Sequence, residues 1–447
     1  MRIVLVSTYE MGRQPFGLAS PAAWLREAGF GVTCVDLSIE AFAEDTLRDA
    51  DLIAFYVPMH TATRMAVRAL ADARHLNPHA HICFFGLYAA ENADYLRSLG
   101  VDTILGGEFE APLVTLATWL SATRSAATPA PTLPTISLAR QAFRVPDRRD
   151  LPPLDRYAHL ALPDGSHRLV GYVEASRGCK HLCRHCPIVP VYNGRFRIIG
   201  RDVVLADIRQ QVAAGAQHIT FGDPDFFNAI GHALPLVEAL HAEFPSLTYD
   251  VTIKVEHLRT HMAHLPTLRA TGCLFITSAV ESFDSAILDI FDKQHTTEDF
   301  ETVLAECRRI GLPLVPTFVA FTPWTTMDSY RDFLRQIARL GLVEGVAPVQ
   351  YTIRLLIPPG SRLLDLPHVR DSVGPLDEAK LSYEWANPDP RVDALQRELS
   401  GIVQRMTRRP RPEVFACVWE HAFGDAYAPP VLPPGLPPPY ITEPWFC

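Results

Sequence analysis

Residues 177–187 read Arg-Gly-Cys-Lys-His-Leu-Cys-Arg-His-Cys-Pro and bring Cys179, Cys183 and Cys186 together on one short stretch. Three thiols on a loop that begins with glycine can converge on one metal centre, and thiolates select zinc or iron and sulfur. A structural zinc site normally takes a fourth Cys or His and more often uses two Cys-x-x-Cys pairs. His181 and His185 lie inside the loop, but no second pair follows. The spacing therefore favours a four-iron, four-sulfur cluster with three irons held by protein and the fourth open to a ligand.

The cysteine loop follows the first of six apolar runs that alternate with helical patterns. The runs cover residues 169–176, 218–222, 248–255, 273–280, 313–321 and 349–357. Strands that alternate with helices at this pitch indicate a full or partial β/α barrel, whose site lies at the carboxyl ends of the strands. We therefore expect the cysteines at the functional end of the barrel.

A second alternating series occupies the first part of the chain and predicts a Rossmann-like, doubly wound parallel sheet. Proline-containing sequence then separates the two series, and another proline-rich stretch ends the chain. The expected fold class is α/β. The expected organisation is a sheet domain at 1–124, a linker at 125–168, the barrel at 169–370 and a tail at 371–447 with a helix near 392–406.

Composition supports a folded chain of two or three cores, since 447 residues include 48% hydrophobic and 20% charged residues. The net charge of -9 and the lack of a basic patch disfavour a nucleic-acid partner. We find no signal peptide and no apolar stretch long enough to cross a bilayer, so we expect a cytoplasmic protein without a membrane partner. In that compartment cysteines are more often metal ligands or core residues than disulfides.

With the cysteine loop in this place, the sequence resembles the radical S-adenosylmethionine (SAM) superfamily, whose hallmark is Cys-x-x-x-Cys-x-x-Cys. The resemblance implies a [4Fe-4S] cluster on the three cysteines, SAM bound at the cluster, and a one-electron reductant such as flavodoxin or ferredoxin. His185 stands where most members have an aromatic residue that contacts adenine. The acidic charge and the lack of a peptide-recognition module leave a small-molecule substrate by elimination.

Other strand ends carry residues that the resemblance assigns to SAM. Gly222, Asp223 and Asp225 match the segment that receives the amino group. The positions matched to the SAM carboxylate and ribose are Lys254, Glu256, Ser278, Glu281 and Ser282, and Arg354 is a further candidate for a SAM or substrate carboxylate. Structural roles also fit, because an Asp in a turn can cap a helix and an Arg in an apolar run can pair with a core carboxylate.

The N-terminal domain resembles the cobalamin-binding domain that precedes the radical SAM core in one large branch. The resemblance rests on Gly106-Gly107-Glu108-Phe109-Glu110 and on segments 322–326 and 357–361. Cobalamin is thus a possible cofactor. The chain lacks the Asp-x-His-x-x-Gly motif that supplies an axial histidine elsewhere, so a structural remnant without cobalamin is the alternative.

Residues 9–24 and 179–196 are similar to bacterial radical SAM proteins with cysteine-rich tails, a group that includes the 3-amino-3-carboxypropyl transferase of arsinothricin biosynthesis. Adjacent tail cysteines can hold a soft element, whereas this tail has only Cys417 and Cys447. These two residues and Arg354 are the catalytic candidates. The other cysteines lie in apolar strands or a helix and are expected in the core: Cys34, Cys83, Cys273 and Cys307.

The predicted function is reductive cleavage of SAM and transfer of a methyl or 3-amino-3-carboxypropyl group to a small molecule in natural-product biosynthesis. One alternative is transfer of the 3-amino-3-carboxypropyl group to arsenite or another soft nucleophile without cobalamin. Another is a non-enzymatic metal-binding regulator.

Overall fold

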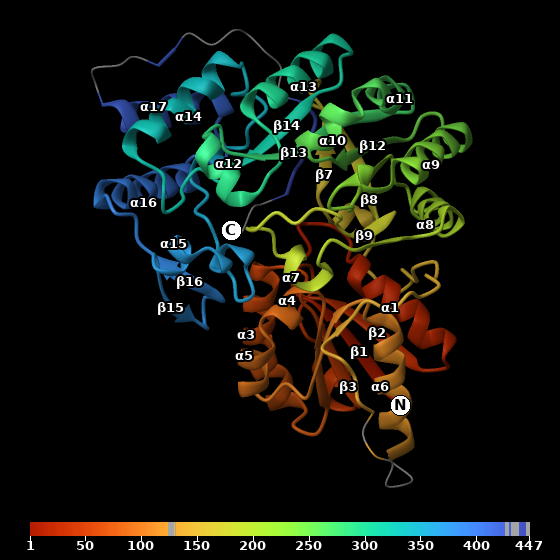
Figure 1. Cartoon of the computed structure of the whole chain (residues 1–447). Helices are drawn as coiled ribbons and strands as arrows, with labels where there is room; N and C mark the ends of the chain where they lie inside the picture. The colour runs from red at the N-terminus through yellow and green to blue at the C-terminus, as the bar shows by residue number, and fades with distance from the viewer. Residues whose placement is uncertain (124–128, 130, 425–428, 431–437, 444–447) are drawn as a thin grey trace.

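The computed structural model describes residues 1–123, 129, 131–424, 429–430 and 438–443. Two α/β parts follow one another along the chain (Figure 1), with the N-terminal sheet in red to orange and the second sheet in yellow to teal. No helix in these ranges is long and apolar enough to cross a membrane.

The N-terminal sheet is parallel throughout, with strand order β2-β1-β3-β4-β5-β6. This confirms the doubly wound sheet. Successive side chains of its strands enter two cores on opposite faces: Ile3 and Leu5 join one, Val4 and Val6 the other. Such burial on both faces explains why the strands read as continuous apolar runs. The strands are β1 (Arg2–Ser7), β2 (Gly31–Asp36), β3 (Leu52–Tyr56), β4 (His81–Phe85), β5 (Thr103–Gly107) and β6 (Ile136–Ser137).

Helices cover both faces of this sheet. They are α1 (Phe16–Glu27), α2 (Glu44–Arg48), α3 (His60–Leu76), α4 (Leu87–Glu91), α5 (Ala93–Ser98) and α6 (Glu110–Thr123). Cys34 and Cys83 lie in these cores, as expected.

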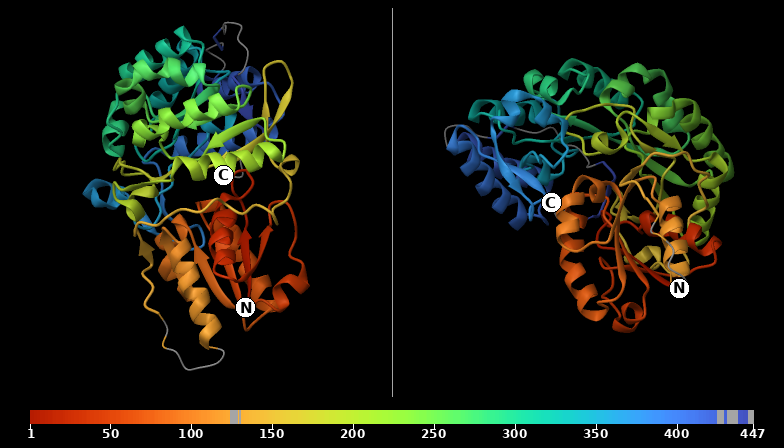
Figure 2. Two further views of the ribbon diagram at one scale, coloured as in Figure 1. Left: turned by 90° about the vertical axis from the view of Figure 1, so that its right-hand side faces the viewer. Right: turned by 60° about the horizontal axis from the view of Figure 1, so that its bottom comes forward.

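The second sheet has the order β14-β13-β12-β11-β8-β7-β17 and curls into a half-barrel. Its strands β8, β11, β12, β13 and β14 are parallel, whereas β7 and β17 run antiparallel at one edge. Helices lie on the convex side (Figure 2). The prediction of a partial barrel is confirmed. The strands are β7 (His159–Ala161), β8 (His167–Val173), β11 (His218–Phe221), β12 (Thr248–Thr252), β13 (Cys273–Glu281), β14 (Leu314–Phe318) and β17 (Tyr440–Ile441).

The remaining elements surround this half-barrel and its main core, which also holds Cys273 and Cys307. The short strands are β9 (Ser176–Gly178), β10 (Phe196–Ile198), β15 (Val373–Asp377) and β16 (Ser382–Trp385). The helices are α7 (Ile188–Tyr192), α8 (Arg201–Ala213), α9 (Ile230–Glu243), α10 (Val255–Thr260), α11 (Leu265–Ala270), α12 (Ser285–Phe291), α13 (Thr297–Arg309), α14 (Met327–Arg339), α15 (Pro367–Arg370), α16 (Pro390–Arg405) and α17 (Arg411–Phe423). The 3₁₀ turns are η1 (Leu154–Arg156), η2 (Phe226–Ala229), η3 (Met262–His264), η4 (Pro348–Tyr351) and η5 (Arg362–Asp365).

The prediction of a sixth barrel strand at 349–357 is wrong. Its first residues form η4, and only Arg354 makes a single bridge with Phe321. The buried Gln350 side chain explains the difference, because its carbonyl oxygen accepts from the Phe318 amide at 2.7 Å and so ends β14 where a sixth strand would pair. The helix expected near 392–406 is α16.

The segment at 125–168 contributes a strand to each sheet, β6 and β7. Within it Arg148 is buried and binds both carboxylate oxygens of Asp207 at 2.7 and 2.9 Å. The same guanidinium donates to the Tyr172 carbonyl and to Gln14. One side chain therefore joins the N-terminal part, this segment and the half-barrel.

Candidate active site at the half-barrel's carboxyl edge

The cysteine loop leaves the half-barrel directly after β8. Strand β9 pairs with β10 and ends at Gly178, whose φ of 76° lies in the left-handed region. A Cβ at this position would lie 2.4 Å from the Tyr192 ring, so both the backbone and the space require glycine. The turn brings Cys179 out at the carboxyl edge of the sheet.

The three thiols are close enough to influence one another electrostatically. Burial, together with the nearby Asp225 and Cys183, raises the pKa of Cys179 to about 11, although a hydrogen bond from the His181 backbone opposes the increase. Burial likewise raises the pKa of Cys186 to about 12, and Cys183 and Cys179 add to the increase while Lys293 opposes it. Such thiols stay protonated at neutral pH unless a metal takes the proton's place. The arrangement fits a cluster held by three thiolates.

Two other elements fix the loop. Asn228 of η2 accepts from the Lys180 amide at 3.2 Å and donates to the Gly178 carbonyl at 3.4 Å. The Arg184 amide donates to the Phe291 carbonyl at 2.9 Å, at the end of α12. Hydrogen bonds to the loop backbone therefore hold both ends of the loop before any ligand binds.

His185, Glu281 and Lys293 form a buried chain beside the loop. The Glu281 carboxylate lies 3.1 Å from His185 Nε2 and 3.3 Å from Lys293 Nζ. Burial acts to raise the pKa of Glu281, but the charges of Lys293 and His185 outweigh it and lower the value to about 2. The His185 ring stacks on Phe291 at 4.3 Å between centroids. Glu281 takes a φ of 69° at an irregularity in β13, which turns its carboxylate toward the loop.

A second group surrounds His181 in the same loop. Asp225 Oδ2 lies 3.2 Å from His181 Nε2 and 2.6 Å from His257 Nδ1 of α10. On the other side of the ring, His181 Nδ1 lies 3.3 Å from Lys254 Nζ and 3.4 Å from Glu256. Burial acts to raise the pKa of Asp225, yet the two imidazoles hold it below its usual value.

The structure brings His185, Asp225, Lys254, Glu256 and Glu281 together around the cysteines. The segment at Gly222 and Asp223 is adjacent, but protein groups occupy it. Asp223 accepts from Ala175 N and Ser176 Oγ, and a Cβ on Gly222 would lie 1.8 Å from the Tyr172 hydroxyl oxygen.

Three predicted residues do not join the site. Ser278 lies on the strand face shared with Ile276 and Val280, which pack into the core beneath the outer helices. Arg354 pairs with Asp393 at 2.6 Å and lies over the Trp385 ring, so it has the core-type carboxylate partner that the sequence left open. Cys417 lies on α17 beside His421.

Ser282 follows β13 and donates nothing to this group; its hydroxyl accepts from the Asp284 amide. The catalytic candidate Cys447 lies outside the described residues.

Sequence reasoning missed Lys293, His257 and His295. His295 is buried, and burial together with Lys293 and Lys254 lowers its pKa to about 4, so it is neutral near pH 7. No motif marks these residues.

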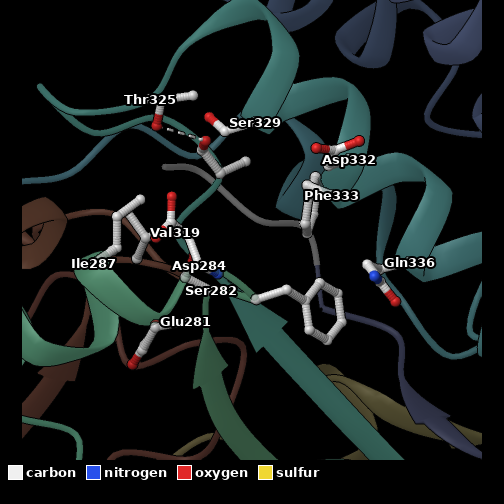
Figure 3. A pocket seen from close by; sticks show the side chains of 12 residues that line it. Glu281, Ser282, Asp284, Ile287, Val319, Thr325, Ser329, Asp332, Phe333 and Gln336 are labelled. Atoms are coloured by element: carbon white, nitrogen blue, oxygen red, sulfur yellow. Dashed lines mark hydrogen bonds between the residues drawn. The ribbon is translucent and has the colours of Figure 1, made fainter. Parts of the chain in front are cut away.

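A cavity of about 290 Å³ lies beside this site, between the ends of β13 and β14 and helix α14. Ser282, Phe333 and Gln336 are among its lining residues, and Figure 3 shows the Glu281 carboxylate pointing away from them. The cavity and the cysteine loop therefore lie on opposite sides of the Glu281 backbone.

The carboxyl edge of the N-terminal sheet faces the cysteine loop. Arg177, two residues before Cys179, is bound by Glu110 at 2.6 Å and by Glu174 at 2.6 Å, with Glu108 at 3.6 Å. Three aromatic rings surround its guanidinium: Phe16, Phe109 and Phe143. The residue that leads into the loop is thus held by the other domain.

Among the described residues, some polar atoms at this N-terminal edge make no hydrogen bond. Ser7 Oγ, Glu10 Oε2 and both carboxylate oxygens of Glu91 are buried in this way. Buried polar atoms of this kind call for an explanation such as an additional ligand, and they fit one rich in amides, as cobalamin is. His60, at the start of α3, has its Nε2 2.6 Å from the Lys380 carbonyl oxygen.

Residues 173–337 match the family model of the radical SAM superfamily. This part of the chain, which holds the cysteine loop, is thus similar to the radical SAM domain, whose superfamily uses a [4Fe-4S] cluster and SAM.

The chain is 25% identical over 176 residues to the tRNA-2-methylthio-N(6)-dimethylallyladenosine synthase of Chlorobaculum tepidum. The match spans 38% of this chain and 39% of that protein, so it covers well under half of the relative.

Two solved structures resemble most of the chain. One is the radical SAM methyltransferase TsrM from Kitasatospora setae, with a TM-score of 0.64 and 16% identity over 92% of this chain and 88% of that one. The other is the cobalamin-dependent SAM radical enzyme OxsB, with a TM-score of 0.65 and 12% identity over 94% of this chain and 71% of that one. At these identities the likeness is one of fold.

Proposed function

We propose that this protein is a radical SAM transferase that cleaves SAM reductively and transfers a SAM-derived group to a small molecule in natural-product biosynthesis. The observation that carries the proposal is the position of three neighbouring thiols, one buried and two partly buried, at the carboxyl edge of the half-barrel, within the segment that matches the radical SAM family model. Cys179, Cys183 and Cys186 would hold a [4Fe-4S] cluster, which would supply the electron for reductive cleavage of a carbon–sulfur bond of SAM.

The protein's own groups prepare this site. The Lys293 ammonium lowers the pKa of Cys186 against the effect of burial, so it favours the thiolate that ligation requires. Glu281 fixes both Lys293 and His185, which leaves the imidazole ring stacked and oriented beside the loop. Burial of these groups excludes water, which would compete with the radical reaction. Lys254 and Glu256 supply paired charges for the amino and carboxylate groups of SAM.

Methyl transfer with cobalamin is the reaction that the fold favours. TsrM is a methyltransferase whose structure holds cobalamin and a [4Fe-4S] cluster, and OxsB was solved with aqua-cobalamin and SAM. The unsatisfied atoms of Ser7, Glu10 and Glu91 lie at the edge that would face such a cofactor. When bound, cobalamin would supply a carrier for the methyl group.

Product analysis tests the proposal. The chain, reconstituted with iron and sulfide under anaerobic conditions, is incubated with dithionite and SAM, and the nucleoside products are separated by mass spectrometry. 5'-Deoxyadenosine supports the methylase reading, and methylthioadenosine instead indicates 3-amino-3-carboxypropyl transfer. Formation of neither, with a metal content that Cys183→Ala leaves unchanged, rejects the radical SAM reading.

A visible spectrum of protein purified in the presence of cobalamin tests the second cofactor. We expect corrinoid absorbance in the wild type and a reduced content in Glu10→Leu, which replaces an unpaired polar group with an apolar one. The matched control is Glu243→Gln, an exposed carboxylate far from this edge.

A further inference from the structure

Three potential metal ligands converge next to the cysteine loop without involving any thiol. His181 Nε2, Asp225 Oδ2 and His257 Nδ1 all lie within 4.8 Å of one another. They come from the cysteine loop, from the turn after β11 and from α10. Asp225 and His257 are buried, and the His181 side chain is only 11% exposed.

These three atoms approach closely although no well-aligned hydrogen bond joins them. The nitrogen–oxygen distances are 3.2 and 2.6 Å, but none of the three atoms makes a hydrogen bond of acceptable geometry. The other oxygen of Asp225 is already used, since it accepts from the Phe227 amide at 3.1 Å. Oδ2 therefore carries a negative charge that faces two imidazole nitrogens in a buried site.

Charged neighbours also fix the second ring nitrogen of His181. In metal sites the second nitrogen of a ligating histidine is usually held by a neighbouring group, which fixes the orientation of the ring. His181 Nδ1 lies 3.3 Å from Lys254 Nζ and 3.4 Å from Glu256 Oε2, and Glu256 is held in place by Lys254 at 2.7 Å. These contacts lie at Nδ1, so the other ring nitrogen, Nε2, is the one that faces Asp225.

We propose that His181, Asp225 and His257 bind one divalent transition-metal ion at a site distinct from the iron–sulfur cluster. Two imidazoles and one carboxylate form a donor set that suits Zn²⁺ or Fe²⁺ and leaves room for water or a substrate group. The ion would hold the cysteine loop against the turn after β11 and against α10. Because His181 lies between Cys179 and Cys183 in the sequence, the ion would also fix the position of these two cysteines. The site shares no ligand with the cluster, since it contains no thiolate.

Cobalt binding to a chain without cluster ligands tests the site. The Cys179→Ser, Cys183→Ser, Cys186→Ser variant of the full chain is titrated with Co²⁺ and followed by its d–d absorption. We expect one Co²⁺ per chain without the sulfur-to-cobalt charge-transfer band of a thiolate site. Adding His257→Ala should weaken binding by more than about tenfold, because loss of a supporting partner alone costs about 10- to 100-fold.

His261→Ala is the matched control. This histidine lies directly after α10 and packs on His257 at 5.8 Å between ring centroids, but it supplies no ligand atom. Its removal should leave Co²⁺ affinity unchanged. Equal affinity in the His257→Ala and His261→Ala variants, or no stoichiometric Co²⁺ binding at all, overturns the proposal.

A second measurement covers the case in which the triple variant does not fold. The wild-type chain with its reconstituted cluster is loaded with Zn²⁺, desalted and analysed for iron and zinc. We expect His257→Ala to retain the iron of the wild type and lose one zinc per chain. Zinc that persists in His257→Ala contradicts the assignment, whereas loss of iron alone would count against the proposed function instead.

Discussion

Replacing Glu281 with Gln should destabilise the half-barrel of the cluster-free chain by about 3 kcal/mol near pH 7. The pKa of Glu281 is lowered from 4.5 to about 2, chiefly by Lys293 and then by His185 against the opposing effect of burial. That difference corresponds to about 3 kcal/mol of interaction with the charged carboxylate. The amide leaves the Lys293 ammonium, 4% exposed, without a carboxylate, and a broken buried pair costs about 3–5 kcal/mol.

The pH dependence has a defined sign. A carboxylate whose pKa is lowered by folding stabilises the native state above its unfolded pKa, near 4.5, and this contribution is lost as the pH falls toward 2. Across that range, the free energy of opening of β13 should therefore fall by about 3 kcal/mol more in the wild type than in the Glu281→Gln variant.

Hydrogen exchange of the β13 amides measures this effect locally, which avoids the need for two-state unfolding of the whole chain. A loss of about 3 kcal/mol in the free energy of local opening predicts that the β13 amide hydrogens exchange about 150-fold faster. Glu243→Gln is the control, because Glu243 forms an exposed two-point pair with Arg209 at 2.6 and 2.8 Å, and exposed pairs contribute less than about 1 kcal/mol. A Glu281→Gln effect no larger than this control refutes the reasoning.

Three further outcomes follow from the candidate site and from the contacts of Arg148 between the two domains. Cys183→Ala should lose the iron and sulfide of the reconstituted protein and the absorbance of the cluster near 400 nm, as chemical analysis and a visible spectrum would show; full retention would contradict the ligand assignment. In the cluster-free chain, alkylation of Cys186 by iodoacetamide should still rise about tenfold per pH unit between pH 8 and 10, because its pKa is about 12; a plateau near pH 9 would show an ordinary thiol. Arg148→Met should destabilise the chain by about 3–5 kcal/mol, as the melting temperature reports, because it leaves Asp207 buried and unpaired; Arg148→Met with Asp207→Leu should recover much of the loss.

The sequence predicted both sheets because their strands are short apolar runs between helical patterns, and that alternation depends only on local periodicity. It failed at 349–357, where the run is equally apolar but the buried Gln350 side chain caps the neighbouring strand. It also gave no strands at β15 and β16, which are short and partly exposed, and β15 contains Gly374 and Pro375, which are uncommon within strands. These differences arise from contacts between distant segments, which periodicity does not encode.

The candidate site divides in the same way. Spacing along one loop identified the three cysteines, because their convergence needs only a short turn. Ser278 and Glu281 were both expected at the site although they are three positions apart, and regular alternation places residues an odd number of positions apart on opposite faces. The irregularity between Ala279 and Glu281 directs the carboxylate, not the hydroxyl, toward the loop. Lys293 and His257 had no local signal, since their partners lie in other elements.

The contacts that Arg177 makes with both domains bear on the role of the N-terminal domain. Its guanidinium is buried between Glu108 and Glu110 of that domain and Glu174 of the half-barrel, two residues before the first cluster cysteine. Burial raises the pKa of Glu108 to about 7 against the effect of Arg177, so this group of carboxylates does not carry its full negative charge. Because removing one partner of a buried ion pair is costly, the domain stabilises the start of the cysteine loop whether or not it binds cobalamin. The sequence left two interpretations open, a structural domain and a cofactor domain, and these are therefore compatible. The contact that supports the loop also holds the carboxyl edges of the two sheets against each other. Ligands bound at the two edges would then meet without a domain movement.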